Sequence, residues 1–370
     1  MAGLYIGLMS GTSLDGADGV LVDFSGPQLK VLASASQTFS LAFRADLLAL
    51  NSAGHNELHR AALAANQLAN LYSQVVTKLL QAAEVTALEV TAIGAHGQTV
   101  RHQPQGGSSD AGYTLQLNNP ALLAERTGID VVADFRSRDV AAGGQGAPLV
   151  PAFHHSVFGR PNATTLVLNI GGISNLSVLP ASGDVLGFDC GPGNALMDAW
   201  CQEHTGQAFD DGGKWAAGGQ CIDALLADLL NEPYFAKQPP KSTGRDLFNM
   251  DWLAGKLTQF SSARPQDVQF TLTELTSSAC IMGASSYINN SDQLIVCGGG
   301  AFNDHLMQRL QAGLPSLKVV PSSAHGLAPL QVEAAAFAWL ARQTTHLLPG
   351  NLPAVTGAAG LRVLGAVYPR

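Results

Sequence analysis

A short segment near the start of this chain combines glycines, hydroxyl groups and carboxylates directly after an apolar strand. It runs over residues 10–18, between a predicted strand at 4–9 and a second one at 20–22. Glycine lets the backbone approach an anion closely, hydroxyls and amides can surround its oxygens, and two aspartates can hold a metal ion or orient a hydroxyl. The pattern indicates a phosphate-binding hairpin, while the same residue types are also common in ordinary polar turns. Its residues are Gly11, Thr12, Ser13, Leu14, Asp15, Gly16, Ala17 and Asp18.

The same plan of strand, glycine turn and strand recurs near mid-chain. Residues 166–179 carry Asn169 at the end of one strand and Gly171-Gly172 in the turn. Two such hairpins predict a duplicated domain. A third glycine run, 298–300, follows a predicted strand at 293–296 and precedes a helix that we expect from Phe302, where the helix dipole favours a phosphate or nucleotide.

Three familiar nucleotide and hydrolase motifs do not fit the chain. A dinucleotide-binding reading of 298–303 requires Gly or Ala at Asn303 and an acidic residue about 20 positions on, where 318–321 reads Lys-Val-Val-Pro. The P-loop pattern and the G-x-S-x-G pattern of serine hydrolases do not occur.

Single polar residues at predicted strand ends are further candidates for chemistry. Asp189 ends a strand, where a carboxylate can act as a general base or simply bond to its own turn. His96 and Gln98 follow another strand and offer donors and acceptors to sugar hydroxyls. Arg136 can clamp a substrate carboxylate with paired donors or be a solvated loop charge. Glu333 starts a helix, where an acid is favoured by the dipole alone.

Composition restricts the class of protein. The 370 residues suggest two domains, and 46% hydrophobic content fits a globular chain. A net charge of −8 with only 20 Lys plus Arg argues against nucleic-acid binding. The five scattered cysteines suggest reduced thiols in the cytoplasm. Neither a signal peptide nor a membrane-spanning run is expected, because the first basic residue is Lys30 and no 18 consecutive residues are apolar.

The elements that must position these residues alternate between strands and helices. Apolar residues recur every three or four positions from Leu58 to Leu79, which predicts one long helix. A helix opened by 119–120 and closed by Gly128 is expected next, and another long helix over 268–289. Further strands are expected at 29–33, 91–95, 113–117, 129–132, 165–169, 174–179 and 185–188. The alternation predicts an α/β fold with two similar halves facing a cleft, and the glycine-rich loop 136–148 is our hinge candidate.

Together, these motifs resemble the anhydro-N-acetylmuramic acid kinases of bacterial cell-wall recycling, members of the actin/hexokinase-like superfamily. The resemblance covers essentially the whole chain. Cys190, Arg101 and the run 327–331 depart from the usual family residues. The matching stretches are 9–16, 94–100, 134–139, 143–151, 168–175, 188–194, 241–245, 296–300 and 350–353.

The resemblance implies a duplicated, ribonuclease H-like, two-domain α/β fold with a central cleft. It implies a phosphotransferase that uses ATP and Mg²⁺ to phosphorylate O6 of 1,6-anhydro-N-acetylmuramic acid while water opens the anhydro bridge at C1. The products are N-acetylmuramate 6-phosphate and ADP. Asp189 is then the base that activates water, and Asp15 a candidate for holding the metal. Residues 11–18 with Asn169, Gly171 and Gly172 cradle phosphates, while Gly298, Gly299, Gly300 and Asn303 bind the nucleotide, and His96, Gln98, Arg136 and Glu333 surround the sugar.

We expect domain I at 1–134 plus about 343–370, and domain II at 135–342. The expected partners are the sugar and ATP, with neither nucleic acid nor membrane, in a cytoplasmic homodimer. Two alternatives stay open: another sugar or acid kinase of the same superfamily, and a non-enzymatic ATP-driven clamp of the actin kind.

Overall fold

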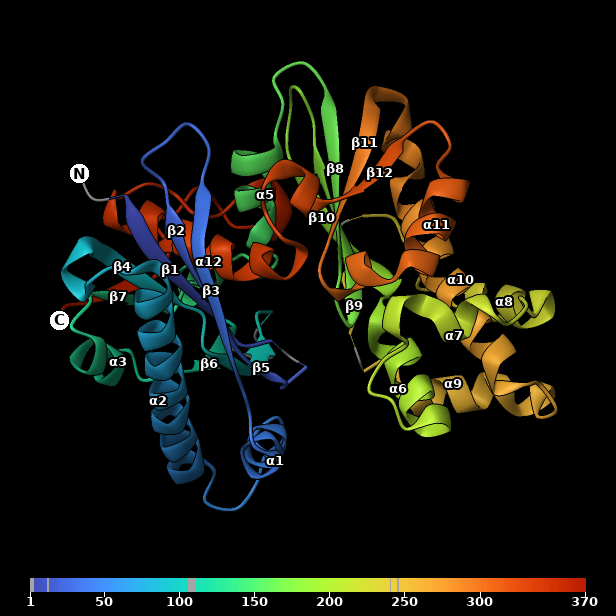
Figure 1. The fold of residues 1–370 in the computed structure, drawn as a ribbon, viewed down its shortest axis with the longest axis horizontal. Helices are drawn as coiled ribbons and strands as arrows, with labels where there is room; N and C mark the ends of the chain where they lie inside the picture. Colours follow the sequence, from blue (N-terminus) through green and yellow to red (C-terminus); the bar gives the residue numbers. More distant parts are fainter. Residues whose placement is uncertain (1–2, 12, 106–110, 240, 245) are drawn as a thin grey trace. The chain divides into compact units, whose positions relative to one another are not determined.

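The structure, a computed structural model, describes residues 3–11, 13–105, 111–239, 241–244 and 246–370. Thr12 and Arg245, which the sequence analysis named singly or within a motif, lie outside the described residues. By internal contacts the chain divides into unit 1, residues 1–157 and 331–370, and unit 2, residues 158–330. Figure 1 shows the course of the chain through both.

Unit 1 is built on a six-stranded mixed sheet in the order β13-β7-β4-β1-β2-β3. β2 is antiparallel to β1 and β3, whereas β4 is parallel to β1 and β7. A separate hairpin joins β5 to β6. The strands are β1 Leu4–Met9, β2 Gly16–Asp23, β3 Lys30–Thr38, β4 Val90–Ala95, β5 Gln98–Gln103, β6 Tyr113–Leu117, β7 Val131–Ala133 and β13 Ala366–Tyr368.

Helices cover both faces of this sheet. The long helix α2 packs against β2 and β3, and α12 packs against β1, β2 and β4. Successive side chains of β1 point to opposite faces of the sheet, so each face contacts a different helix. Ile6 and Leu8 enter the core with α2, while the Tyr5 hydroxyl lies 3.0 Å from Thr345 Oγ1 of α12. The helices are α1 Leu41–Ala49, α2 Glu57–Ala83, α3 Pro120–Thr127, α4 Ser137–Ala141, α5 Val150–Phe158, α12 Val332–Thr345 and α13 Pro353–Thr356.

Two glycines allow α12 to lie directly on the sheet. A Cβ at Gly7 of β1 would come within 1.8 Å of the Ala334 carbonyl oxygen, and one at Gly94 of β4 within 2.0 Å of the Phe337 carbonyl oxygen. Backbone therefore contacts backbone. The position of the helix that carries Glu333 depends on the absence of two side chains.

Unit 2 repeats the strand plan in a five-stranded sheet of order β10-β9-β8-β11-β12. β9 is antiparallel to both its neighbours, and β11 is parallel to β8 and β12. The order and directions equal those of β3-β2-β1-β4-β7. The α/β class and the duplicated fold are thus confirmed. The elements are β8 Thr164–Ile170, β9 Ile173–Leu179, β10 Leu186–Pro192, β11 Ser291–Cys297, β12 Lys318–Pro321, α6 Asn194–Thr205, α7 Lys214–Ala217, α8 Asp223–Leu230, α9 Met250–Leu257, α10 Pro265–Ala284 and α11 Asp304–Gly313.

Several boundaries differ from those expected. Leu58, placed on the apolar face of the long helix, is 89% exposed, because burial along α2 starts only at Ala64. The helix expected from Phe302 is present as α11 but begins at Asp304, because Gly299–Phe302 forms a 3₁₀ turn and Asn303 is the cap. The second long helix ends at Ala284 and continues as a 3₁₀ turn.

The division into units falls at 157/158 and 330/331, where the sequence had suggested 134/135 and about 342/343. Residues 136–148, the hinge candidate, therefore lie inside unit 1. All of α12 also belongs to unit 1, because its apolar face covers β1 and β4.

Candidate active site

The candidate sugar-binding residues of unit 1 come together around one buried histidine. His96 follows β4, is 4% exposed, and its ring lies 4.6 Å from that of Phe337 on α12. Arg136, directly before α4, lies on the other side with Nε 3.1 Å from His96 Nε2. Its Nη1 donates to the Gly146 carbonyl at 2.8 Å. The guanidinium is therefore fixed from two directions.

Burial and charge set the protonation of this group. Burial, together with the positive charge of Arg136, lowers the pKa of His96 to about 3, so its ring is neutral near pH 7 and Nε2 can accept a hydrogen bond. Burial also lowers the pKa of Arg136 to about 10, opposed by the negative charges of Glu333 and Asp139. Arg136 stays charged at neutral pH, beside a neutral acceptor.

Glu333 links this cluster to the first hairpin. Burial raises its pKa, the positive charge of Arg136 opposes that rise, and the negative charge of Asp18 adds to it. Gln98, 1% exposed, accepts a short hydrogen bond from the Ser10 hydroxyl through its Oε1. The structure thus brings the hairpin and all four candidate sugar residues into one region of unit 1.

The first hairpin turn itself is tight. The Leu14 N–H donates to the Gly11 carbonyl at 3.2 Å, and Leu14 adopts a φ of 60°. Asp15 and Asp18 lie close enough to interact: burial raises the pKa of Asp18 and the negative charge of Asp15 raises it further. Two neighbouring carboxylates of this kind suit a cation. The described residues include no group of three or more His, Cys, Asp and Glu side chains arranged for a metal.

In unit 2, the second hairpin and the glycine run meet at the carboxyl end of β8. The amides of Gly193 and Asn194 donate to the carbonyls of Gly172 and Gly171 at 2.9 and 2.7 Å. These bonds occupy carbonyls that would otherwise repel a phosphate. A Cβ at Gly298 would lie 2.5 Å from Asn169 Oδ1, so this run is packed against the hairpin. A Cβ added at Gly300 would meet Ile170 of the hairpin, and one added at Gly299 would meet Asn194 of α6.

Asn303 caps the helix that follows the glycine run. Its Oδ1 accepts from the Leu306 N–H at 2.9 Å and caps α11. Beside it lies Gly213, whose Cβ would come within 2.1 Å of that same oxygen. The segment 210–214, which sequence reasoning did not select, thus lies at the start of α11, and its Asp-Asp-Gly-Gly run was the signal that could have found it.

Asp189 lies on β10 and pairs with Asn175 of β9. The Thr243 N–H donates to its Oδ2 at 3.0 Å, its own N–H donates to the Lys241 carbonyl at 3.1 Å, and the Tyr234 hydroxyl donates to its carbonyl at 2.8 Å. Burial raises the pKa of Asp189 to about 6, and the bond from Thr243 opposes that rise. A carboxylate with that pKa is ionised at neutral pH and basic enough to take a proton. Sequence reasoning missed Tyr234 and assigned no role to Thr243.

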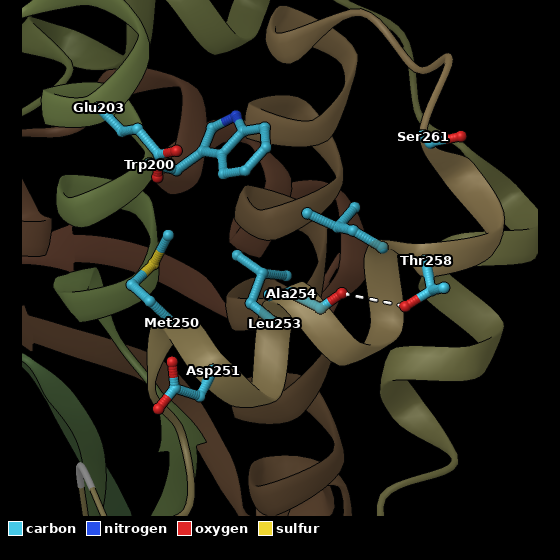
Figure 2. A pocket seen from close by; sticks show the side chains of 9 residues that line it. Trp200, Glu203, Met250, Asp251, Leu253, Ala254, Thr258 and Ser261 are labelled. Carbon is cyan, nitrogen blue, oxygen red and sulfur yellow. Dashed lines mark hydrogen bonds between the residues drawn. The ribbon is translucent and has the colours of Figure 1, made fainter.

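A pocket of about 450 Å³ lies between α6 and α9 (Figure 2). Its lining includes Trp200 and Glu203 of α6 and Asp251 of α9, and none of the candidate residues named above.

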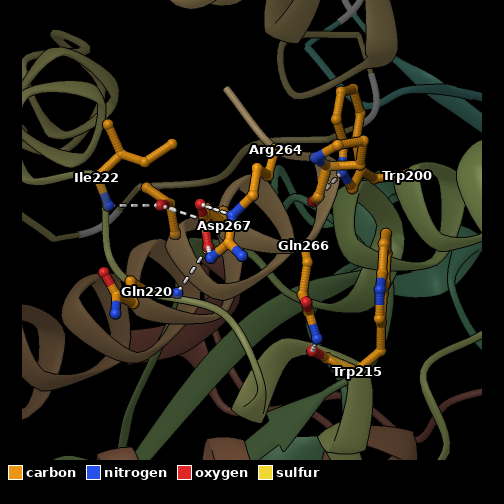
Figure 3. A network of polar contacts seen from close by, with 9 residues as sticks. Trp200, Trp215, Gln220, Ile222, Arg264, Gln266 and Asp267 are labelled. Carbon is orange, nitrogen blue, oxygen red and sulfur yellow. Dashed lines mark hydrogen bonds and ion pairs between the residues drawn. The ribbon is translucent and has the colours of Figure 1, made fainter. Parts of the chain in front are cut away.

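A polar network at the start of α10 lies nearby in sequence (Figure 3). There Asp267 accepts two bonds from Arg264 and one from the Gln220 N–H, which anchors the segment before α8. These hydrogen bonds hold the start of α10 and the segment before α8 together within unit 2.

No helix within the described ranges is long and apolar enough to cross a membrane.

Comparison with known proteins gives consistent matches. The family described as "Anhydro-N-acetylmuramic acid kinase" matches residues 3–370. The chain is 64% identical over 389 residues to a protein of that name from Albidiferax ferrireducens, and 64% identical over 375 residues to one from Variovorax paradoxus. Both alignments cover 100% of each chain. Among solved structures, a xylulose kinase from Rhodospirillum rubrum aligns with a TM-score of 0.44 and 12% identity, covering 91% of this chain and 89% of that one.

Proposed function

This chain belongs to the anhydro-N-acetylmuramic acid kinase family, and from that premise we propose how its residues carry out the reaction. ATP phosphorylates O6 of 1,6-anhydro-N-acetylmuramic acid while water opens the anhydro bridge at C1. The products are N-acetylmuramate 6-phosphate and ADP, which places the enzyme in peptidoglycan recycling. The observation that carries the proposal for this chain is the half-buried Asp189 with a pKa raised to about 6.

Asp189 is the proposed base. It removes a proton from water as the water oxygen bonds to C1, and the C1–O6 bond breaks. The O6 electron pair then attacks the γ-phosphorus, and the bond from that phosphorus to the ADP oxygen breaks. O6 receives the phosphoryl group in place of a proton, so the departing oxygen requires no separate general acid. The bond from the Thr243 N–H to Oδ2 fixes the orientation of the carboxylate and supports this role.

His96, Gln98, Arg136 and Glu333 are the proposed contacts to the sugar. Arg136 carries a charge that suits the lactyl carboxylate of a muramic acid, since a guanidinium presents paired donors to a carboxylate. Support comes from its fixed orientation between His96 and Gly146. The buried, neutral His96 and Gln98 suit hydroxyl and amide groups.

The two glycine hairpins, residues 298–300 and Asn303 are the proposed nucleotide contacts, with Thr12 among them. Mg²⁺ bound with ATP would neutralise charge on the transferring phosphoryl group. Asp15 and Asp18 fit its needs, because Mg²⁺ is usually held by one or two carboxylates together with phosphates. The negative charge of Asp15, which adds to the raised pKa of Asp18, supports this assignment.

A cytoplasmic location and a homodimer are also proposed. None of the five cysteines, all of which lie within the described ranges, forms a disulfide, which supports a reducing compartment. The homodimer is tested by light scattering at several protein concentrations.

The decisive experiment is turnover of the anhydro-sugar and Mg-ATP in ¹⁸O-labelled water, followed by mass analysis of the products. We expect the label on the anomeric carbon of the sugar, with inversion setting the initial anomer. Label in phosphate would mean that water attacks phosphorus and that the protein is an ATPase. A conventional sugar kinase retains the acceptor oxygen and incorporates no label. A clamp of the actin kind hydrolyses ATP slowly without any sugar, so ADP formation in its absence is the matched control.

A further inference from the structure

We propose that Asp139 is a positioning residue for Arg136, acting through the backbone N–H and C=O of Gly146, and that it thereby sets the affinity for the sugar. This inference rests on the proposed function, because Arg136 is one of the sugar contacts named there.

The Asp139 carboxylate is fully buried and held by neutral donors. It is 0% exposed, and its Oδ1 accepts from Asn351 Nδ2 at 2.7 Å and from the Thr356 hydroxyl at 2.8 Å. Its Oδ2 accepts from the Gly146 N–H at 2.8 Å. A carboxylate buried without a directly bonded cation carries a large desolvation cost, which a neutral side chain would avoid. A role that needs the acceptors or the charge explains why an acid occupies this position.

The bond to Gly146 connects this carboxylate to Arg136. The N–H of Gly146 donates to Asp139, and the carbonyl of the same residue accepts from Arg136 Nη1 at 2.8 Å. Gly146 has a φ of 67°, and a Cβ at Gly144 would lie 2.2 Å from Asp139 Oδ2. The loop is thus wrapped closely around the carboxylate. Its negative charge also favours the charged form of Arg136.

The opposite side of the loop is held by a segment more than 200 residues away in sequence. Besides the two bonds to Oδ1, the Gln145 N–H donates to the Thr356 carbonyl at 2.7 Å, and the Ala359 N–H to the Ala142 carbonyl at 2.8 Å. Asp139 therefore lies between this segment and the loop, and only its Oδ2 faces Gly146.

The substitution Asp139→Asn distinguishes the bond to Gly146 from the bonds to Asn351 and Thr356. With its carbonyl toward Asn351 and Thr356, the new amide keeps two bonds but points its NH₂ at the N–H of Gly146, donor against donor. The reverse orientation sets the new NH₂ against the Asn351 NH₂ and also requires the Thr356 hydroxyl to change from donor to acceptor, so the first is favoured. We expect the sugar KM to rise at least about tenfold, as for loss of a hydrogen bond to a charged group, while the KM for ATP stays unchanged.

Thr356→Val is the matched control. It removes a hydroxyl bond to the same buried carboxylate and lowers thermal stability, but leaves the Gly146 connection intact, so the sugar KM should not change. A double-mutant cycle adds a readout that instability does not affect: in the Arg136→Ala background, Asp139→Asn should have no further effect on sugar KM. Additive effects, or equal sugar KM values for D139N and T356V, would overturn the inference.

If D139N does not fold, Gly146→Ala and Gly143→Ala test the same connection. Both place alanine at a positive φ, but the new Cβ would meet Val140 Cγ2 at 2.8 Å at position 146 and nothing within 4 Å at position 143. A raised sugar KM in G146A alone supports the inference, and equal values in both refute it. The wild-type enzyme distinguishes a failure of this inference from a failure of the proposed function. If wild-type enzyme forms no ADP in response to the sugar, the proposed function itself is contradicted.

Discussion

Two nitrogens of Arg136, Nε and Nη2, lie 3.1 and 3.0 Å from the same acceptor, Nε2 of His96. That contact requires the unprotonated nitrogen, which burial provides by lowering the pKa of His96 to about 3. The second direction is held by the Gly146 carbonyl, which accepts from Nη1. The chain's own contacts thus orient this side chain, and such preorganisation reduces the entropic cost of binding.

Arg136→Lys should raise the KM for the anhydro-sugar about tenfold or more, with a smaller effect on kcat. Lysine keeps the charge but cannot bond to His96 and Gly146 at once or present paired donors, and a lost charge-assisted hydrogen bond is worth about 1.5–3 kcal/mol. Steady-state kinetics with varied sugar measure the effect. The exposed Arg138 supplies the control, because R138K makes the same exchange outside the cluster. Equal KM values for the two variants would contradict the role of Arg136.

Asp189→Asn should reduce kcat by about 100-fold or more while sugar and nucleotide bind nearly as before, because a general base acts chiefly in the transition state. Calorimetric titration of both ligands and single-turnover kinetics measure binding and chemistry separately. Asp184→Asn, in the exposed segment before β10, is the matched control. Retention of more than about a tenth of the wild-type kcat would show that Asp189 is not the base.

The pH dependence of kcat/KM should show an acidic limb near pH 6. Burial raises the pKa of Asp189 to about 6, and only the ionised form accepts a proton, so activity should fall about tenfold per pH unit below that value. Since the folded-state pKa lies above the ordinary 3.8, protonation of Asp189 favours the folded state. Its stabilising effect is complete below pH 3.8 and is lost as the pH rises through 6. Loss of activity at pH 5 therefore cannot come from acid unfolding at this residue, and near-ultraviolet circular dichroism checks that the fold persists.

Gly94→Ala and Gly255→Ala should change stability in opposite directions. The Cβ at position 94 would lie 2.0 Å from the Phe337 carbonyl and force α12 off the sheet, costing about 3 kcal/mol or more. Gly255 lies exposed in α9 with nothing within 4 Å of its Cβ, so alanine should stabilise that helix by about 0.5–1 kcal/mol. Urea unfolding measures both. G94A should also raise the sugar KM, because α12 carries Glu333; an unchanged KM in folded G94A would refute that link.

Elements that are specified by neighbouring residues in the chain could be predicted from the sequence. The strand at 113–117 and the helix over 120–127, with Asn119 as its cap and Gly128 at its end, are confirmed to the residue. The short helices α7 and α13 were not predicted, because four residues show no periodicity. Strand β13 is only three residues long and forms by pairing with β7, which no local signal reveals.

The candidate site likewise contains residues that the local sequence reveals and contacts that only the tertiary fold creates. Glycine turns and polar residues at strand ends could be selected from the sequence, because the backbone conformation at these positions admits few residue types. The bond from Thr243 to Asp189 joins residues 54 positions apart, and the bond from Asn351 to Asp139 joins residues 212 apart. Such contacts follow from the tertiary fold. The role of Asn303 also depended on context, since its side chain caps α11.

Unit 1 is assembled from two stretches of chain, with all of unit 2 encoded between them. During synthesis, β1 and β4 emerge early, but α12, which covers Gly7 and Gly94, is not translated until after residue 331. Contiguous domains fold as units during synthesis, so unit 2 can fold while one face of the first sheet is still bare. A nascent chain interrupted before α12 has its first hairpin but lacks Glu333, and the sheet face at Gly7 and Gly94 stays uncovered. Such a truncated chain holds every residue of unit 2 but cannot complete unit 1.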